Sequence, residues 1–160
     1  MKQIFKNKSG FTLVELLVVV AIIGMLSSLA TVSLNSARTK ARDSKRFADV
    51  RQLQLAVELC FQEGGSYPLL GAMGTLPLDY ECGPLETLPA LSSFLGIQPL
   101  DPSTYQPYSY CSLDESNIAA GCTDSAGTSY QIEFTLEDGS GTLPAGTHCV
   151  IPAGVLVGPC

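Results

Sequence analysis

The side chains in this 160-residue sequence that could carry out covalent chemistry are six cysteines and a single histidine, His148. A catalytic cysteine needs a neighbouring cation or imidazole that stabilises its thiolate. No Lys or Arg follows Arg51, and His148 lies beside Cys149 in the short run THCVI, which predicts a strand. The sequence therefore argues against an enzyme and favours disulfide bonds as the role of the cysteines.

All six cysteines follow a long apolar segment, and no two are spaced as C-x-x-C, the pair that metal sites favour. They are Cys60, Cys82, Cys111, Cys122, Cys149 and Cys160. This pattern fits an oxidising compartment and up to three disulfides, with no resident metal. Spacing leaves the connectivity open, and we favour sequential pairing, in which Cys60 joins Cys82 and the other two pairs close short loops.

One carboxylate, Glu15, stands inside the apolar run of residues 11–34, FTLVELLVVVAIIGMLSSLATVSL. That run is long enough to cross a bilayer core, which takes about 20 residues. An ionisable group within hydrocarbon costs roughly 2.5–3.5 kcal/mol even on lenient scales. Either a partner offsets that cost, or Glu15 lies near the membrane interface by accident.

Helical signals extend well beyond the apolar run. From Phe11 to Glu63 there is no proline and one glycine, Gly24, whereas all ten prolines fall at or after Pro68. One long helix is predicted, closed by Gly64-Gly65. At about 1.5 Å per residue it would reach roughly 75–80 Å, so its exposed half needs partners.

The second half of this helix is predicted to be amphipathic and to pack on a head domain. Its apolar stripe consists of Phe47, Val50, Leu53, Val57, Cys60 and Phe61, and the polar residues Arg46, Asp49, Arg51, Gln52 and Glu58 are expected largely off it. The chain thus divides into a polar segment at 1–10, a transmembrane helix at 11–34, an amphipathic stem helix at 35–63 and a globular head at 64–160.

The head is predicted to hold a small antiparallel sheet over the stem helix, which gives an α+β fold. SYQIEFTLE alternates strictly, with Tyr130, Ile132, Phe134 and Leu136 on one face. YSYCSL at 108–113 and THCVI at 147–151 are its expected neighbours. Residues 66–106 are expected to be irregular, apart from a helical turn between Glu86 and Gly96.

Charge is divided sharply along the chain. Residues 1–51 carry nine basic and three acidic groups, a balance of +6, and residues 52–160 carry twelve acidic groups and no basic one. Nucleic acid would be repelled by such a head, so no nucleic-acid binding is expected. We hypothesise that basic stems attract the acidic heads of neighbouring subunits.

The segment K-S-G-F-T-L-V-E, from Lys8 to Glu15, resembles the prepilin class of signal sequence. Type IV pilins and type II secretion pseudopilins share a short basic leader, a glycine before the cleavage site, usually phenylalanine after it, and a glutamate five residues into the mature chain. Gly10, Phe11 and Glu15 match this pattern. The resemblance covers residues 1–62 firmly and about 63–137 loosely.

The resemblance implies a filament subunit, for adhesion, motility, DNA uptake or secretion, in which residues 1–10 are the leader peptide and residues 11–34 form the transmembrane or filament-core helix. A prepilin peptidase would cut between Gly10 and Phe11, with N-methylation of Phe11. Glu15 would then meet the N-terminal amine of a neighbouring subunit during assembly. The implied partners are other pilin-like subunits, this peptidase, a membrane assembly platform with its ATPase, and the lipid bilayer.

Small residues lie on roughly one face of the apolar helix: Ala21, Gly24, Ser28 and Thr31. This spacing lets helices approach closely and is interpreted as packing in the filament core, although such residues are common in any membrane helix. The family often has a proline about twenty residues after the cut, and this chain has Leu29, Ala30, Thr31 and Val32 there. Local helix melting on assembly is thereby put in doubt.

Two further segments resemble pseudopilin heads, GGSYP at Gly64–Pro68 and D-P-x-x-x-x-P-Y-x-Y at Asp101–Tyr110. Many such heads hold calcium, for which this chain offers Asp114, Glu115, Asp124, Glu137 and Asp138. Their spacing is not dense, so solvated surface is the favoured interpretation and no cofactor other than calcium is suggested.

The basic residues that flank the span give no clear orientation. Localisation is therefore inferred from two other signals. The cysteines and the peptidase motif favour a single-pass protein of the cytoplasmic membrane with its head outside, later moved into an extracellular or periplasmic filament. The alternative is a membrane-anchored, exported binding domain that does not polymerise. The choice between pilus and secretion pseudopilus stays open.

Overall fold

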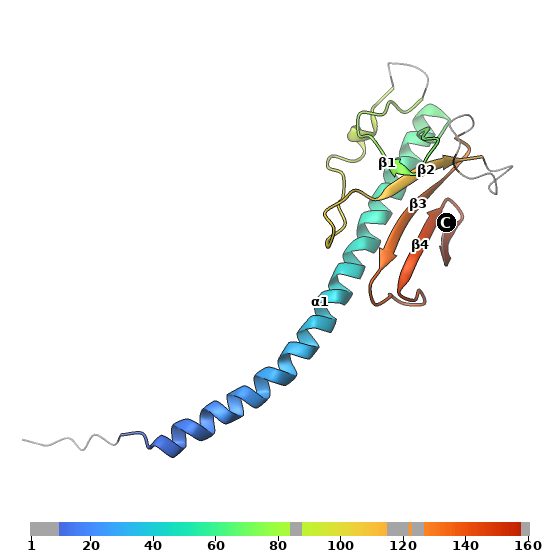
Figure 1. Ribbon diagram of the computed structural model, residues 1–160. Coiled ribbons are helices and arrows are strands. Elements are labelled where there is room, and N and C mark those ends of the chain that lie inside the picture. The colour runs from blue at the N-terminus through green and yellow to red at the C-terminus, as the bar shows by residue number, and fades with distance from the viewer. Residues whose placement is uncertain (1–9, 84–87, 115–121, 123–126, 158–160) are drawn as a thin grey trace, which may run out of the picture. The chain divides into compact units, whose positions relative to one another are not determined.

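The computed structural model describes residues 10–83, 88–114, 122 and 127–157 (Figure 1). The leader residues 1–9, the calcium candidates Glu115 and Asp124, and Cys160 lie outside the described residues. The chain divides into two compact units, Met1–Arg38 and Thr39–Cys160. We refer to the second as the head unit, since it contains the C-terminal half of the long helix together with the whole sheet.

Helix α1 runs from Leu13 to Gly64, within two residues of its predicted start and end. It stops because Gly65 adopts a left-handed conformation, with φ of +76°, and donates its backbone N–H to the carbonyl of Phe61 at 2.7 Å. Gly64 must be glycine for another reason. A Cβ atom there would lie 1.9 Å from the carbonyl oxygen of Cys82, so a disulfide-linked loop crosses the helix end in close contact.

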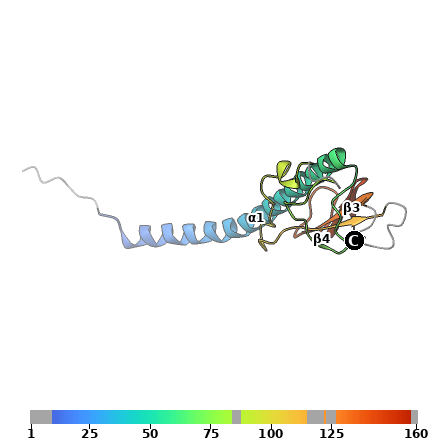
Figure 2. The same cartoon turned by 90° about the horizontal axis from the view of Figure 1, so that it is seen from above.

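The sheet has five antiparallel strands in the order β1-β2-β3-β4-β5. Their bounds are β1 Gly74–Thr75, β2 Ser109–Leu113, β3 Ser129–Leu136, β4 Gly146–Ile151 and β5 Gly154–Val157, and a 3-10 helix, η1, covers Leu91–Ser93. Figures 1 and 2 show the central strands beside the C-terminal half of α1. The predicted α+β layout and its three predicted strands are confirmed, while β1 and β5 were not predicted.

One hydrophobic core joins helix to sheet within the head unit. The apolar stripe of α1 contributes Val50, Leu53, Val57 and Cys60, all buried, with Phe47 and Phe61 partly buried against them. Alternation in β3 places Tyr130, Ile132, Phe134 and Leu136 in the same core, as expected for a half-buried strand. The prediction that the amphipathic half of the helix packs on the sheet is confirmed.

Two side chains expected on the polar face of α1 are buried instead. Arg46 is 3% exposed and Asp49 is 7% exposed, and Asp43 is fully buried one turn before Arg46. The prediction placed Arg46 and Asp49 off the buried stripe because the periodicity argument assigns charged residues to solvent. That assignment is wrong here because each of these charges meets a specific partner from the sheet or the loops.

Candidate functional site

Residues around the predicted cleavage site precede the helix. Gly10, Phe11 and Thr12 are exposed and lie outside any helix or strand, and α1 begins at Leu13. A Cβ atom built on Gly10 would meet nothing within 4 Å. The Gly10–Phe11 peptide bond is therefore presented in irregular, accessible backbone, the kind of segment that a peptidase can bind.

Glu15 closes a reciprocal cap at the start of α1. The backbone N–H and the hydroxyl of Thr12 donate to Glu15 Oε2 at 2.8 and 2.7 Å, and the backbone N–H of Glu15 donates to Thr12 Oγ1 at 3.2 Å. This is a capping box, which satisfies donors that the first turn of a helix leaves free. Within a single chain, the Glu15 carboxylate thus has local partners, and both residues remain exposed.

The apolar segment that follows is exposed among the residues that the structure describes. Large side chains such as Leu13, Val20 and Met25 are 80%, 61% and 71% exposed. The hydroxyl of Ser28 donates to the carbonyl of Met25 at 2.8 Å, and that of Thr31 donates to Ser27 at 2.9 Å. Because these hydroxyls are hydrogen-bonded inside the helix, the surface that this segment offers to a partner is apolar. By length and composition, α1 could cross a membrane.

Ala21, Gly24, Ser28 and Thr31, the four small residues of the predicted packing face, all lie in this uncovered part of α1. A Cβ atom on Gly24 would meet nothing within 4 Å, so nothing in the single chain requires glycine there. Their role in packing stays a prediction that concerns other molecules.

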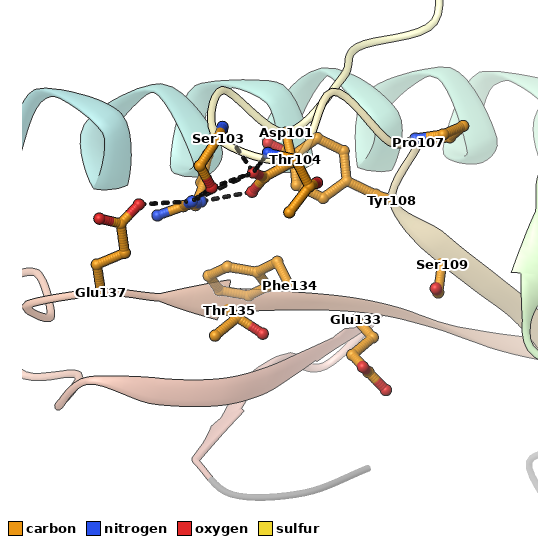
Figure 3. Close-up of a pocket in the computed structure, with 11 residues that line it drawn as sticks. Asp101, Ser103, Thr104, Pro107, Tyr108, Ser109, Glu133, Phe134, Thr135 and Glu137 are labelled. Atoms are coloured by element: carbon orange, nitrogen blue, oxygen red, sulfur yellow. Dashed lines mark hydrogen bonds and ion pairs between the residues drawn. The ribbon is translucent and has the colours of Figure 1, made fainter. Parts of the chain in front are cut away.

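Arg46 is the centre of a charged cluster in the head unit. Its Nε donates to Asp101 Oδ2 at 2.6 Å and its Nη1 to Asp43 Oδ1 at 2.7 Å, and its Nη2 lies 2.8 Å from Glu137 Oε1. Nη2 also donates to the hydroxyl of Ser103 at 2.6 Å. Figure 3 shows Asp101, Ser103 and Glu137 beside the helix, with dashed lines marking these contacts. One buried cation thereby joins α1, the loop before β2 and the end of β3.

Asp43 ties the turn after β3 to the helix. Its carboxylate accepts the backbone N–H groups of Glu137, Asp138 and Gly139 at 2.9, 2.9 and 3.1 Å. Burial opposes ionisation, but these donors together with Arg46 hold the pKa of Asp43 below its ordinary value. A carboxylate buried with this many donors is a structural anchor for the β3–β4 turn.

The other acidic groups of the cluster are held ionised in the same way. Hydrogen bonds from Arg42 lower the pKa of Glu137 to about 2, with a further contribution from Arg46. Arg42 reaches Glu137 through two guanidinium nitrogens, with Nε at 2.9 Å. Burial opposes ionisation of Asp101, but Arg46 and Ser103 hold its pKa well below its usual range.

Three tyrosine hydroxyls add polar links from the sheet and the loops to the helix. The hydroxyl of Tyr108 donates to Asp49 at 3.1 Å, and those of Tyr67 and Tyr130 donate to the two carboxylate oxygens of Glu58 at 3.1 and 3.2 Å. Burial, and then the Asp49 charge, raise the pKa of Tyr108 well above its usual range. The D-P-x-x-x-x-P-Y-x-Y segment therefore supplies both Asp101 and Tyr108 to the helix.

These helix charges could have been found in the sequence. Asp43, Arg46, Val50, Leu53, Val57 and Cys60 follow one another at alternating spacings of three and four residues. The buried stripe thus extends two positions further toward the N-terminus than its apolar members indicate. What the sequence does not reveal is their partners in the loops and the sheet, which lie more than 50 residues away.

A pocket of about 480 Å³ lies beside the cluster, lined among others by Arg46, Asp101, Tyr108, Phe134 and Glu137 (Figure 3). Asp101 and Glu137 in its lining are already paired with Arg46. No group of three or more His, Cys, Asp or Glu side chains suited to a metal occurs in the part of the chain that the structure describes. Of the calcium candidates, Glu137 is committed to Arg42 and Arg46.

Disulfides Cys60–Cys82 and Cys111–Cys122 are present, in agreement with the sequential pairing that we favoured. Cys149 is also disulfide-bonded, and its expected partner Cys160 falls outside the described residues. His148 is buried in β4, where its Nε2 lies 2.8 Å from the carbonyl oxygen of Pro144 and its ring packs against Phe134. The cysteines in the part of the chain that the structure describes are disulfide-bonded and offer His148 no thiol.

Comparisons with known proteins agree with the N-terminal pattern. Residues 5–31 match the family model described as the prokaryotic N-terminal methylation motif. This match confirms the resemblance to the prepilin class of signal. No solved structure matches the chain.

Curated relatives include fimbrial and secretion proteins. The chain is 39% identical over 59 residues to a probable minor fimbrial protein of Dichelobacter nodosus, which is 37% of each chain. It is 35% identical over 63 residues to type II secretion system core protein G of Aeromonas hydrophila, 39% of this chain and 44% of that protein. It is 34% identical over 103 residues to type IV major fimbrial protein FimA of Dichelobacter nodosus, 60% of this chain and 62% of FimA. The chain thus spans less than two thirds of the length of these relatives.

Proposed function

We propose that this chain, whose prepilin-type N-terminus and α+β layout are those of type IV pilins and pseudopilins, is a structural subunit of such a filament. The observation that carries the proposal is the methylation motif at residues 5–31, which includes most of an apolar helical segment whose large side chains are exposed among the described residues. Other copies in a filament cover such a surface, whereas a monomer in water would expose it.

Processing is the first step of the proposed pathway. A prepilin peptidase on the cytoplasmic side cleaves the Gly10–Phe11 bond and the new Phe11 amine is methylated. The exposed, non-helical placement of this bond supports the step, because a peptidase can bind it without unwinding α1. The leader with its three lysines is lost, and the apolar helix stays in the membrane as a single span with the head outside.

Assembly then brings Glu15 to a new partner. A carboxylate in hydrocarbon carries a cost of roughly 2.5–3.5 kcal/mol, which Thr12 offsets in part through the capping box. In the filament the Phe11 amine of a neighbouring subunit supplies a full opposite charge in a medium of low dielectric constant. The pair sets the axial register, while Ala21, Gly24, Ser28 and Thr31 allow close helix packing.

The head unit has a structural role in this proposal. Its buried charges pair with one another and join helix to sheet, which leaves them unavailable for catalysis. The partners are other pilin-like subunits, the peptidase, and an assembly platform with its ATPase. The same architecture serves pili and secretion pseudopili, so the proposal covers both.

Processing can be tested by the mass of the N-terminal peptide from protein recovered separately from host membranes and from sheared surface material. A chain that begins at methylated Phe11 in both fractions supports the proposal. A Gly10→Leu variant, which places a bulky side chain beside the scissile bond, is expected to retain its leader and stay in the membrane. If the unaltered protein keeps residues 1–10 and occurs in membranes alone, it is an anchored, exported domain and not a filament subunit.

A further inference from the structure

The C-terminal end of strand β3 has a strand partner on one side only. On that side β4 pairs with β3 as far as Leu136, which lies opposite Gly146. On the other side β2 pairs with β3 only from Ser129 to Glu133. The β2-side backbone of Phe134–Leu136 therefore meets no strand in the part of the chain that the structure describes. Such an edge is a template for pairing with another extended chain.

Pro107 explains why the pairing of β2 with β3 stops where it does. Ser109 lies opposite Glu133, so the same register continued by two residues would set Pro107 opposite Thr135. Proline has no backbone N–H and cannot donate to the strand beside it. Pro107 instead forms an isolated bridge with Leu100, in the loop that precedes β2. The edge of β3 beyond Glu133 is therefore left open by the sequence of its own neighbour.

The pocket of about 480 Å³ lies at this open edge, and we call it the β3 edge groove. The loop before β2 lines it with Ser103, Thr104 and Pro107, and β3 lines it from Glu133 to Thr135. Figure 3 shows the loop residues on one side of this space and the residues of β3 on the other. Three residues of an extended chain cover about 10 Å, which matches the three residues of β3 that lack a partner.

The loop wall of the β3 edge groove is fixed before anything binds. The Asp101 carboxylate accepts the backbone N–H groups of Ser103 and Thr104 at 2.8 and 2.9 Å. The Arg46 guanidinium in turn donates to both oxygens of that carboxylate, at 2.6 and 3.2 Å. A wall held in this way loses little conformational freedom when a ligand binds, which favours association.

The charges in the lining favour a basic occupant. One base, Arg46, lines the groove together with three acids, Asp101, Glu133 and Glu137. The Arg46 side chain is 3% exposed, whereas those of Asp101 and Glu137 are 16% and 31% exposed. The charge that the groove presents is therefore an excess of carboxylate, which attracts a cationic chain and repels an anionic one.

The alternation of β3 fixes where the side chains of an added strand would lie. Phe134 faces the core, whereas Glu133 and Thr135 lie on the opposite face of the strand and are not buried. Neighbouring strands place their side chains on the same two faces, so alternate residues of the added strand would lie beside Phe134 and beside Glu133. The fitting sequence alternates apolar and basic residues.

We propose that the β3 edge groove binds a short extended segment of another protein, with alternating apolar and basic residues, as an added strand beside Phe134–Leu136. Hydrogen bonds between the two main chains supply the affinity, and the alternate side chains supply the selectivity. The basic stem of a second copy does not meet this requirement, because its backbone groups are already bonded within a helix. This binding site goes beyond the proposed structural role of the chain in a filament.

The first test follows amide hydrogen exchange of the full chain in detergent, with and without the acetylated and amidated peptide Val-Lys-Val-Lys-Val. We expect the peptide to slow the exchange of at least one amide of Phe134–Leu136 by about tenfold or more. The same peptide methylated at every backbone nitrogen keeps its side chains but cannot donate, and it should have no effect. Unchanged exchange at these three residues with the unmethylated peptide, or equal protection by the methylated one, would overturn strand addition.

The second test addresses the charge preference. Glu133→Lys should lower the affinity for Val-Lys-Val-Lys-Val by about fivefold or more, because it sets like charges on neighbouring strands. Glu63→Lys is the matched control, since Glu63 is exposed outside the groove, and it should leave the affinity unchanged. Equal losses in both variants, or equal binding of Val-Glu-Val-Glu-Val to the unaltered chain, would overturn the assignment of a basic peptide. Neither test requires filaments, so their outcome is separate from that of the proposed function.

Discussion

The N-terminal segment and the head unit place their functional residues in opposite ways. Around Gly10, Phe11 and Glu15 the informative residues are neighbours in sequence, they are exposed, and the single chain gives them few contacts. In the head unit the informative residues are buried, and their partners in the sheet and loops lie 55 to 96 residues away. In the proposed filament the first region is completed by other molecules, whereas the second makes its contacts within one chain.

Because of this difference, substitutions in the N-terminal segment and in the head unit should affect different properties, assembly and folding respectively. Substitutions in the N-terminal segment should impair assembly and leave the fold intact, because the head unit makes its core contacts without that segment. Substitutions in the charged cluster should impair the fold first. The predictions below follow this division, from the largest expected effect to the smallest.

Replacing Glu15 with leucine should abolish filaments in sheared material while the head unit folds normally. Removing one partner of a buried ion pair typically costs about 3–5 kcal/mol, and the pair is repeated at every subunit of the filament. Electron microscopy of sheared material, with the subunit level measured in membranes, checks this.

Thr12→Val is the matched control for that change. It removes the hydroxyl that caps the helix but keeps the carboxylate, and loss of a cap costs about 0.5–2 kcal/mol. Filaments should therefore still form. If Glu15→Leu assembles as well as Thr12→Val, the carboxylate has no role between subunits.

Replacing Arg46 with alanine should destabilise the head unit by about 3–5 kcal/mol, because it leaves Asp43 buried without its cation and Asp101 without its anchor. Denaturant unfolding of the full chain in detergent, followed by circular dichroism, measures this. Arg51→Ala is the control, since Arg51 is exposed on the same helix and should change the free energy of unfolding by less than about 0.5 kcal/mol. Equal effects would show that the Arg46 cluster is not a structural anchor.

Removing the Cys60–Cys82 disulfide by paired alanine substitutions should lower the free energy of unfolding by about 3 kcal/mol. The bond joins residues 22 apart, and a longer closed loop restricts the unfolded chain more. Paired substitution of Cys111 and Cys122, which are 11 apart, should cost somewhat less. The same unfolding measurement gives both values, and a reversed order would mean that native contacts outweigh loop entropy.

Acid should weaken the head unit between about pH 5 and pH 2. The pKa of Glu137 is about 2 in the folded chain, and those of Asp43 and Asp101 are also lowered. A carboxyl group whose pKa is lower in the folded chain than in the unfolded chain stabilises the fold at pH values above its unfolded pKa, near 4. This contribution is lost as the pH falls through its folded pKa.

Glu137→Gln should flatten this pH dependence in part, because it removes the charge that Arg42 and Arg46 meet while Asp43 and Asp101 keep theirs. Unfolding curves at pH 7, 5, 4 and 3 for both proteins check the sign. Stability that rises as the pH falls over this range would contradict the assigned ionisation states.

Much of the fold was predictable because local signals agreed. The absence of proline before Pro68 and the Gly64-Gly65 pair bounded α1 to within two residues, and the alternation in β3 identified the core face of the central strand. Strand β1 was missed because two residues carry no periodicity. Strand β5 was missed because a four-residue run following Pro152 gives too little pattern.

The charged cluster could not be predicted because a sequence pattern does not show which distant groups meet. Asp101 was noticed only as part of a motif and Glu137 only as a calcium candidate, yet both bind Arg46. Hydrophobic periodicity places charged residues in solvent by default, and a paired, hydrogen-bonded charge is the exception to it. The N-terminal site was easier to predict because its pattern is short and contiguous.

The central claim is most directly tested by cryo-electron microscopy of sheared surface material combined with the N-terminal peptide mass of the same sample. The account predicts filaments in which helices beginning at methylated Phe11 form the axial core, with each Glu15 carboxylate beside the Phe11 amine of a neighbour. A chain that retains its leader, remains dispersed in the membrane and is missing from every filament would contradict it.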